Sequence, residues 1–269
     1  MGDGQVTTLA DKTDPTKAAA FDWRLALESL RRPYPLNFRT AVPMAALILL
    51  VPFYIFIAEL MPGRALHAPE IALDRVIPLR PAWVLVYGAL YLFLILLPVL
   101  IVRQEQLIRR TLWTYLAVWI AAYVFFFLYP TEAPRPARVA GSGFAVWGLR
   151  FLYEADPPYN CFPSLHVAHS FVSAIACRRV HRGLGLAAAA CAVLVGVSTL
   201  FTKQHYVLDV IAGILLAAIA GLIFLRGRPR EAVPDIDRRA APALAMAVIG
   251  ILALVAACFW VAYAGSAGA

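Results

Sequence analysis

The stretch of sequence that decides the fold is AWVLVYGALYLFLILLPVLIV, at residues 82–102. It contains no charged side chain, and it is as long as the ~20 apolar residues that an α-helix needs to cross a bilayer. We therefore expect residues 82–102 to form a transmembrane helix.

Further apolar runs lie on both sides of this segment. They cover about 39–61, 111–130, 164–180, 184–201, 205–225 and 242–264. The run at 164–180 is the most polar, and the run at 184–201 is short for a span. The pattern predicts an all-α polytopic transmembrane bundle, with a six-helix core and a seventh span near the C-terminus.

The composition also indicates a membrane protein. Of the 269 residues 62% are hydrophobic and 15% charged, against ~45–50% and ~25% in soluble domains. This excludes a disordered tail protein, a disulfide-stapled secreted domain and an ordinary cytosolic enzyme. The four cysteines have no metal-ligand spacing, and we interpret them as small buried hydrophobic residues. They are Cys161, Cys177, Cys191 and Cys258.

Polar composition sets the two ends of the chain apart from the centre. Residues 1–37 lack the apolar region of a signal peptide. Within them, Phe21 to Leu30 mixes large apolar and charged residues, which favours a short helix on the membrane surface, after a disordered tail from Met1 to Lys17. We predict an N-terminal segment at 1–37, a membrane-embedded domain at 38–230, and a linker with an extra helix at 231–269.

The basic residues predict the orientation. Of the 24 Lys and Arg residues, 17 fall on the N-terminal side of the predicted membrane and 7 on the other. Cytoplasmic loops are enriched in Lys and Arg, so the N-terminus is expected in the cytoplasm and loops 62–81, 131–163 and 202–204 outside. The net charge of +8 is spread over short clusters rather than one stripe. We expect lipids and the bilayer as partners, and no nucleic acid.

A first polar cluster is NCFPSLHVAH, at residues 160–169. Pro163 suits the start of a helix, which would place Ser164 and His166 in its first turn. Free N–H groups and the positive dipole end at such a helix start favour an anion.

A second cluster is STLFTKQHYVLD, at residues 198–209. His205 and Asp209 are four residues apart and share one helix face. A carboxylate beside an imidazole fixes its tautomer and leaves the other ring nitrogen free as a nucleophile or a base.

A third cluster is PTEAPRPAR, at residues 130–138, where prolines flank Arg135. A rigidly held guanidinium is a suitable fork for phosphate oxygens. All three clusters are predicted on the outer face of the membrane.

Simpler interpretations exist for each residue. His166 could be an interfacial histidine that bridges helices, and His205 with Asp209 a structural ion pair or proton relay. His166 and His169 could form a metal pair, but no third ligand is evident, so we expect no metal and no cofactor. His169 is then a core residue or a support for the site. Arg135 could anchor a lipid headgroup.

Together the clusters resemble the type 2 phosphatidic acid phosphatase superfamily. Its motifs are Lys, six residues, Arg-Pro; then Pro-Ser-Gly-His; then Ser-Arg, five residues, His, three residues, Asp. Here the second reads Pro163-Ser164-Leu165-His166, and the third runs from Ser198-Thr199 to His205 and Asp209. The first is reduced to Arg135-Pro136, with Leu128 at the Lys position. The resemblance covers roughly residues 70–225.

The resemblance implies a role for each matched residue. His205 would attack phosphorus and form a phosphohistidine, Asp209 would orient it, and His166 would protonate the leaving oxygen and then activate the acceptor. Phosphate oxygens would be held by Arg135, Ser164 and helix N–H groups. Separately from the resemblance, we expect Lys203, or else Arg138, to replace the cations that the motifs lack. The residues expected around them are Asn160, His169, Ser198 and Tyr206.

The departures from the superfamily pattern suggest a substrate. Thr199 and Leu128 remove two of the three cations that the pattern supplies for a phosphomonoester dianion. A phosphodiester carries one charge fewer, so we expect headgroup transfer between lipids. The inositol phosphorylceramide synthase branch is the one that this sequence resembles, in Phe162-Pro163-Ser164-Leu165-His166, Ser198-Thr199 and His205-Tyr206. The alternatives are a lipid phosphomonoester phosphatase, of the phosphatidic acid or polyprenyl phosphate type, and a proton-coupled transporter. The Ala- and Arg-rich composition suggests a bacterial inner membrane, with the site facing the periplasm.

Overall fold

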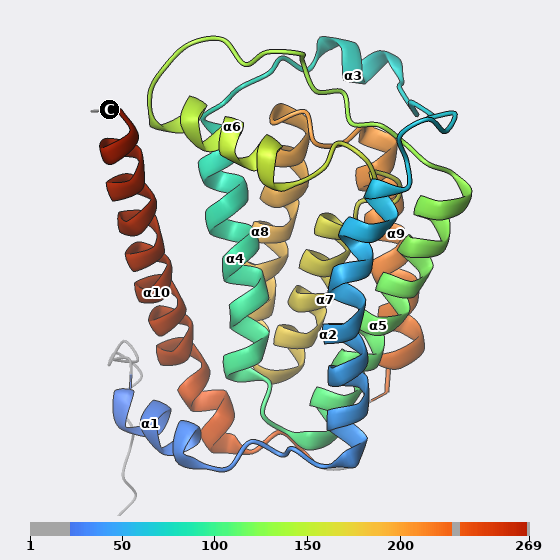
Figure 1. Ribbon diagram of the computed structural model, residues 1–269. Helices are drawn as coiled ribbons and strands as arrows, with labels where there is room; N and C mark the ends of the chain where they lie inside the picture. Colours follow the sequence, from blue (N-terminus) through green and yellow to red (C-terminus); the bar gives the residue numbers. More distant parts are fainter. Residues whose placement is uncertain (1–21, 228–231, 268–269) are drawn as a thin grey trace, which may run out of the picture.

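The computed structural model describes residues 22–227 and 232–267. These residues form an all-α bundle, as the sequence predicts, with ten helices and no strand among them (Figure 1). The predicted tail from Met1 to Lys17 lies outside the described residues.

Each of the seven predicted apolar runs is a helix. They are α2 (Phe38–Glu59), α4 (Trp83–Ile101), α5 (Glu105–Leu128), α7 (Leu165–Val180), α8 (Arg182–Phe201), α9 (Val207–Phe224) and α10 (Asp235–Ala267). Helices α5 and α10 begin several residues before the apolar runs do, because polar first turns start them. In α5, for example, the Gln104 side chain accepts the Leu107 N–H. All of these helices except α7 are long and apolar enough to cross a membrane.

Helix α7 is the centre of the bundle. It has 16 residues, so it is about 24 Å long at 1.5 Å per residue, and it packs against α4, α5, α8 and α9. Its N-terminus starts below the level that α4 and α8 reach at the same end (Figure 1). Protein rather than lipid surrounds it, which explains why this run tolerates buried Ser170 and Ser173.

Two short helices cover the end of the bundle at which α7 begins. They are α3 (Ala72–Val76) and α6 (Phe144–Ala155), and the sequence analysis predicts neither. Helix α6 lies across the ends of the long helices (Figure 1). Its 12 residues are too few for a span, so hydropathy does not distinguish it from a loop.

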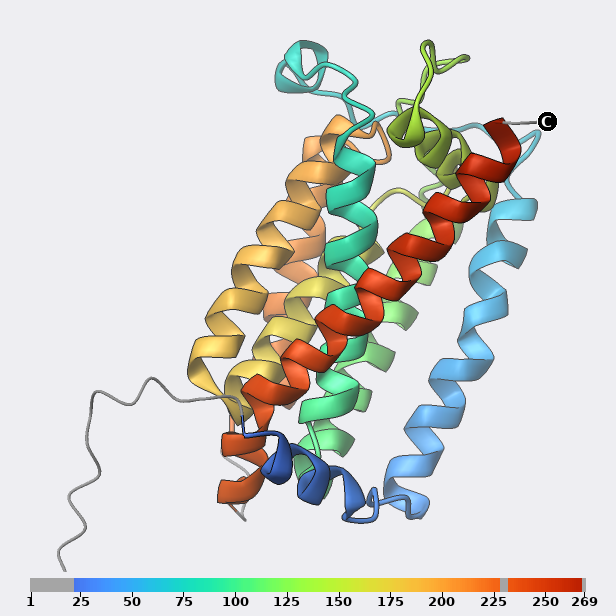
Figure 2. The same ribbon diagram turned by 90° about the vertical axis from the view of Figure 1, so that its left-hand side faces the viewer.

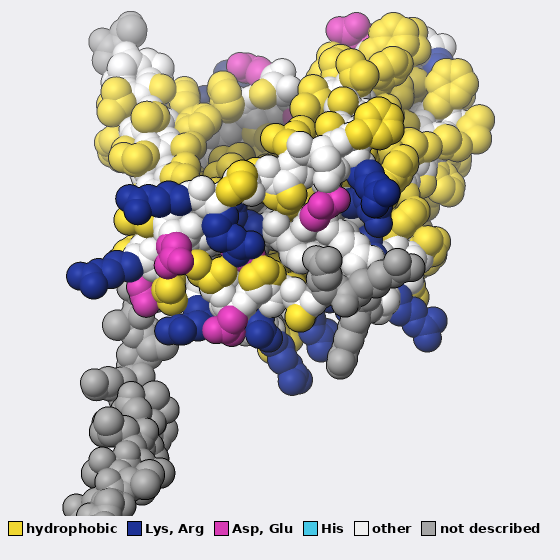
Figure 3. Space-filling model, turned by 90° about the horizontal axis from the view of Figure 1, so that it is seen from below, with side chains coloured by type: hydrophobic (Ala, Val, Ile, Leu, Met, Phe, Trp, Pro, Cys, Tyr) yellow, Lys and Arg dark blue, Asp and Glu magenta, His cyan; other side chains and the backbone are white. Residues whose placement is uncertain are grey.

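Helix α1 (Trp23–Arg31) lies at the opposite end of the bundle, as expected for a short helix ahead of the first span (Figure 2). The Ser29 hydroxyl and the Arg32 guanidinium both donate to Asp237 of α10, at 2.9 Å each. Lys and Arg side chains gather on this end face of the molecule (Figure 3).

One cysteine departs from the prediction of four buried thiols. Cys161 and Cys177 are buried and Cys191 is half-buried, but Cys258 is exposed. It lies in the C-terminal part of α10, where the apolar residues Leu254, Trp260 and Val261 are exposed as well.

Candidate active site

The start of α7 fixes the position of His166. Ser164 is the N-cap residue, and its Oγ accepts the Val167 N–H at 3.4 Å. Its own N–H donates to the Asp209 carbonyl of α9 at 3.0 Å. A Cβ at Gly213 of α9 would lie 2.5 Å from the Ser164 carbonyl oxygen, so only glycine permits this approach. Ser164 therefore joins the starts of two helices.

The loop between α8 and α9 fixes the position of His205. The Asp209 carboxylate accepts the Tyr206 N–H at 2.8 Å and so caps its own helix. The same oxygen, Oδ2, lies 3.4 Å from Nδ1 of His205. Both side chains are buried, at 4% exposure for His205 and 0% for Asp209. A buried carboxylate in ion-pair distance stabilises positive charge on the imidazole.

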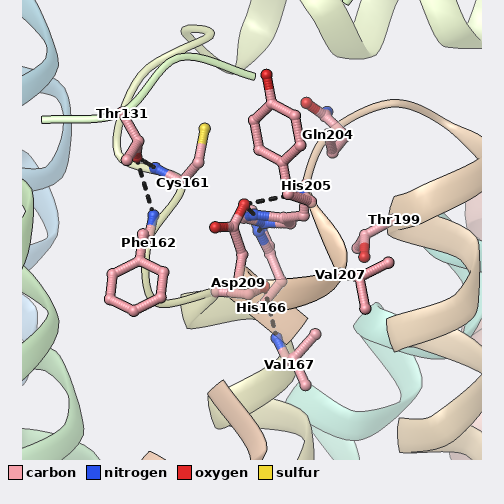
Figure 4. A network of polar contacts seen from close by, with 12 residues as sticks. Thr131, Cys161, Phe162, His166, Val167, Thr199, Gln204, His205, Val207 and Asp209 are labelled. Carbon is pink, nitrogen blue, oxygen red and sulfur yellow. Dashed lines mark hydrogen bonds and ion pairs between the residues drawn. The ribbon is translucent and has the colours of Figure 1, made fainter. Parts of the chain in front are cut away.

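The structure brings the two predicted histidines together. Nδ1 of His166 lies 3.3 Å from Nε2 of His205. Since Nδ1 of His205 faces Asp209, the three side chains form one chain of contacts, carboxylate to imidazole to imidazole (Figure 4). These groups come from the first and second sequence clusters, and all lie at the end of the bundle covered by α6.

Arg135, from the third cluster, lies at the same end. Its guanidinium donates to the carbonyls of Asp156 at 2.7 Å and Tyr153 at 3.2 Å, and to the side chain of Gln204, the residue before His205. It also lies 3.5 Å from the Asp156 carboxylate. Among the described contacts, Arg135 is the one guanidinium that binds the loop carrying His205, and Asp156 neutralises its charge.

A family model described as the PAP2 superfamily matches residues 66–223, which is more than half of the chain. The chain belongs to the PAP2 superfamily. This confirms the superfamily expected from the motifs, and supports an enzyme of the phosphatase or phosphotransferase class. No curated protein and no solved structure matches the chain.

The PAP2 match covers the helices that carry the histidine site and leaves the ends of the chain outside. It begins before α3 and ends within α9, so α1, α2 and α10 are additions to the matched part.

Lys203 holds a loop in place. Its Nζ donates to the carbonyl of Asp74 at 3.2 Å. The carboxylate of Asp74 accepts the Val207 N–H of α9 at 2.8 Å and the Ile71 N–H at 2.9 Å. This residue pair ties α3 to the loop that carries His205, and a phosphate-binding role for Lys203 stays a prediction.

The four residues expected around the site differ in their distance from it. The Tyr206 N–H donates to the Asp209 carboxylate at 2.8 Å, and the Asn160 side chain donates to the Tyr54 carbonyl at 2.8 Å. The Ser198 hydroxyl donates to Val195 within α8. The His169 ring faces away from His205, toward α5, as described below.

Several residues that touch the site are absent from the sequence prediction. Tyr87 and Tyr91 of α4 place their rings edge-on to His166, with centroids 5.5 and 5.0 Å away. Asp156 holds Arg135 and also accepts the Tyr54 hydroxyl at 2.8 Å. The tyrosines lie inside an ordinary apolar run, so the sequence gives no signal for them. Asp156 lies in a polar loop four residues before the first cluster, and this position is the signal that could have indicated it.

Among the described residues, no group of three or more His, Cys, Asp or Glu side chains is placed to hold a metal ion. The first turn of α7 instead offers backbone N–H groups. The N–H groups of Leu165 and His166 lie in the first turn, where no carbonyl of the same helix can accept their hydrogen bonds. They lie at the positive end of the helix dipole, which favours phosphate oxygens.

Proposed function

We propose that this protein is an integral membrane enzyme that transfers a phospho group of a lipid through a phosphohistidine at His205. The observation that carries the proposal is the contact chain Asp209–His205–His166, at 3.4 and 3.3 Å. Nδ1 of His205 faces the carboxylate, so Nε2 is the nitrogen available for attack on phosphorus. Asp209 then stabilises the positive charge that the His205 imidazole carries after the attack.

His166 is the proposed acid and base. It protonates the oxygen that leaves as His205 attacks, and then takes a proton from the acceptor hydroxyl that attacks the phosphohistidine. A phosphorus atom does not fit between nitrogens 3.3 Å apart, so substrate binding must separate the two rings. The proposed holders of the non-reacting oxygens are the N–H groups at the start of α7, Ser164 and Arg135.

The charge at the site supports headgroup transfer as the leading reaction. Leu128 is 71% exposed, and Thr199 is fully buried with its hydroxyl donating to Gly196. Neither supplies a cation, and Asp156 neutralises Arg135. A phosphodiester has one negative charge fewer than a monoester, so it suits this site better. We propose a reaction like that of the inositol phosphorylceramide synthase branch, with lipid phosphomonoester hydrolysis as the alternative.

A comparison of two substrates tests this choice. Purified protein is given phosphatidic acid in one arm, and phosphatidylinositol with ceramide in the other. We expect a product with the transferred headgroup and little phosphate release. Rapid phosphate release from phosphatidic acid with no transferred headgroup would replace the transferase by the phosphatase.

The same end of the bundle is proposed to face the periplasm of a bacterial inner membrane, with the N-terminus in the cytoplasm. The gathering of Lys and Arg side chains at the opposite end supports this orientation (Figure 3). The buried charged side chains of the described residues lie at helix ends, as Asp209 and Asp237 do, rather than through the membrane depth. This does not favour a proton-relay transporter.

A further inference from the structure

A cavity of about 430 Å³ lies between α4, α6 and α10. Its wall is made of aliphatic and aromatic side chains, and the contribution of α10 is Leu252, Val255, Ala256 and Phe259. Gly88 of α4 also lines it, and a Cβ at Gly88 would meet no atom within 4 Å. An apolar cavity of this size at the side of a membrane bundle can hold a hydrocarbon chain.

The cavity reaches the histidine site through α4. Tyr87 lines the cavity, and the same ring lies edge-on to His166, with centroids 5.5 Å apart. Tyr87 is buried, at 5% exposure, and it connects the wall of the cavity to His166. A molecule with a polar head and an apolar chain could occupy both sides of this ring.

Helix α6 makes a second connection between cavity and site. Phe151 and Leu152 line the cavity, and the next residue, Tyr153, lies under the Arg135 guanidinium at 4.6 Å. Burial raises the pKa of Tyr153 to about 12, so its hydroxyl keeps its proton and donates to the Thr202 carbonyl at 2.7 Å. The helix that walls the cavity therefore also positions the predicted phosphate-binding cation.

Helix α10 forms one wall of the cavity, and it lies outside the residues that the family model matches. It crosses the bundle obliquely in front of α4 (Figure 2), and Phe259 contacts the rings of Trp147 and Phe151 edge-on, at 6.3 and 5.5 Å. Since residues 66–223 end before α10, this wall is an addition of this chain to the matched part.

We propose that this cavity binds one hydrocarbon chain of the lipid whose phosphorus is attacked by His205. The inference rests on the proposed function for the identity of the headgroup. Bulk lipid is as apolar as the cavity, so the benefit is in orientation: a chain fixed beside Tyr87 holds its headgroup at the histidines.

Photo-crosslinking tests occupancy without requiring turnover. The probe is phosphatidic acid with a diazirine in one acyl chain, applied to the full-length protein in nanodiscs. We expect crosslinks on α4, α6 and α10, and their loss when an excess of dihexanoyl phosphatidic acid competes for the headgroup site. Crosslinks confined to other helices, or labelling of α10 that the short-chain competitor does not reduce, would overturn the proposal.

Two glycine variants make the test specific. Gly88→Leu fills the cavity with a side chain whose Cβ has open space, so the helix can accommodate it. Gly250→Leu is the matched control, because Gly250 lies on the exposed part of α10, outside the cavity lining, and its Cβ also meets nothing within 4 Å. We expect Gly88→Leu to remove the crosslinks and Gly250→Leu to keep them. Equal labelling of both variants would contradict the proposal.

Chain-length dependence gives the kinetic arm. In Gly88→Leu, with ceramide as acceptor, the ratio of kcat/KM for dioleoyl over dihexanoyl phosphatidylinositol should fall about tenfold, because a displaced chain no longer holds its headgroup at the histidines. An unchanged ratio in this variant would contradict chain binding. If the wild type turns over neither lipid, the proposed function fails for this headgroup, and the crosslinks alone decide whether the cavity holds its chain.

Discussion

The two sides of α7 differ in what their histidines contact, although His166 and His169 are one helical turn apart. Toward α9, His166 lies 3.3 Å from His205, which in turn faces Asp209. Toward α5, the His169 ring stacks on Tyr115 with centroids 4.4 Å apart, and its Nδ1 has no hydrogen-bond partner among the described residues. His166 therefore has a second imidazole and a carboxylate in line with it, whereas His169 stacks on the ring of a tyrosine.

The difference shows that distant parts of the chain, rather than histidine spacing, define the site. The His169 side borders a second cavity, of about 160 Å³, whose other lining residues are Leu47, Ile48, Val51, Tyr115 and Trp119. Nothing charged lines it, so positive charge on His169 would be unfavourable there. The same residue type on the same helix is therefore suited to proton transfer on one side and to packing on the other.

The largest expected effect comes from removing the proposed nucleophile. His205→Ala should lower kcat by about 10⁴-fold or more, because the reaction then lacks its covalent intermediate. Turnover of a ³²P-labelled lipid, with an acid-labile and base-stable label on the quenched protein, measures both activity and intermediate. If the acid-labile ³²P label also forms on the His205→Ala protein, the covalent intermediate is on another residue.

A matched pair of substitutions then tests the comparison directly. His166→Phe should lower kcat by about 10³-fold, within the range for loss of a general acid and base. His169→Phe keeps an aromatic ring against Tyr115, removes the nitrogens, and adds one ring atom beside a cavity, so we expect activity within about twofold of wild type and an unchanged or higher Tm. Equal losses in the two variants would mean that both sides of α7 take part in the chemistry.

The sequence predicts most of the helices and the main contact of the site. Long apolar runs specify the helices locally, and the motif order brings His166 and His205 to one end of the bundle. Helix α6 could not be predicted in this way because its 12 residues are too few to register as a span, and a single loop carboxylate such as Asp156 carries no periodic signal. The side of α7 that each histidine faces depends on how α4, α5 and α9 pack around it, which no local pattern encodes.

A smaller effect is expected from the charge beside Arg135, on the polar side of α7. Asp156→Asn keeps an oxygen for the Tyr54 hydroxyl and the backbone carbonyl that holds Arg135, but removes the neutralising charge. A monoester gains more from this than a diester, so the ratio of their kcat/KM values should rise about fivefold, since one charge pair contributes on the order of 1 kcal/mol in a partly solvated site.

The control for this charge change is Asp235→Asn. Asp235 is 69% exposed and pairs with Arg238 at the far end of the bundle, so its loss alters the net charge by the same amount away from the site. The substrate ratio of this variant should stay at the wild-type value. A ratio that falls in Asp156→Asn would indicate that Asp156 positions Arg135 rather than neutralising it.

The smallest effect on activity is expected on the α5 side. The Tyr115 hydroxyl and the Ser173 hydroxyl are 2.6 Å apart in the core, and Tyr115→Phe removes this hydrogen bond while keeping the ring against His169. The free energy of unfolding should fall by about 1 kcal/mol, because the Ser173 hydroxyl is left buried without its partner. Thermal unfolding in detergent measures the loss, and kcat should remain within about twofold. A large loss of kcat with unchanged stability would assign chemistry to the side of α7 that here only packs.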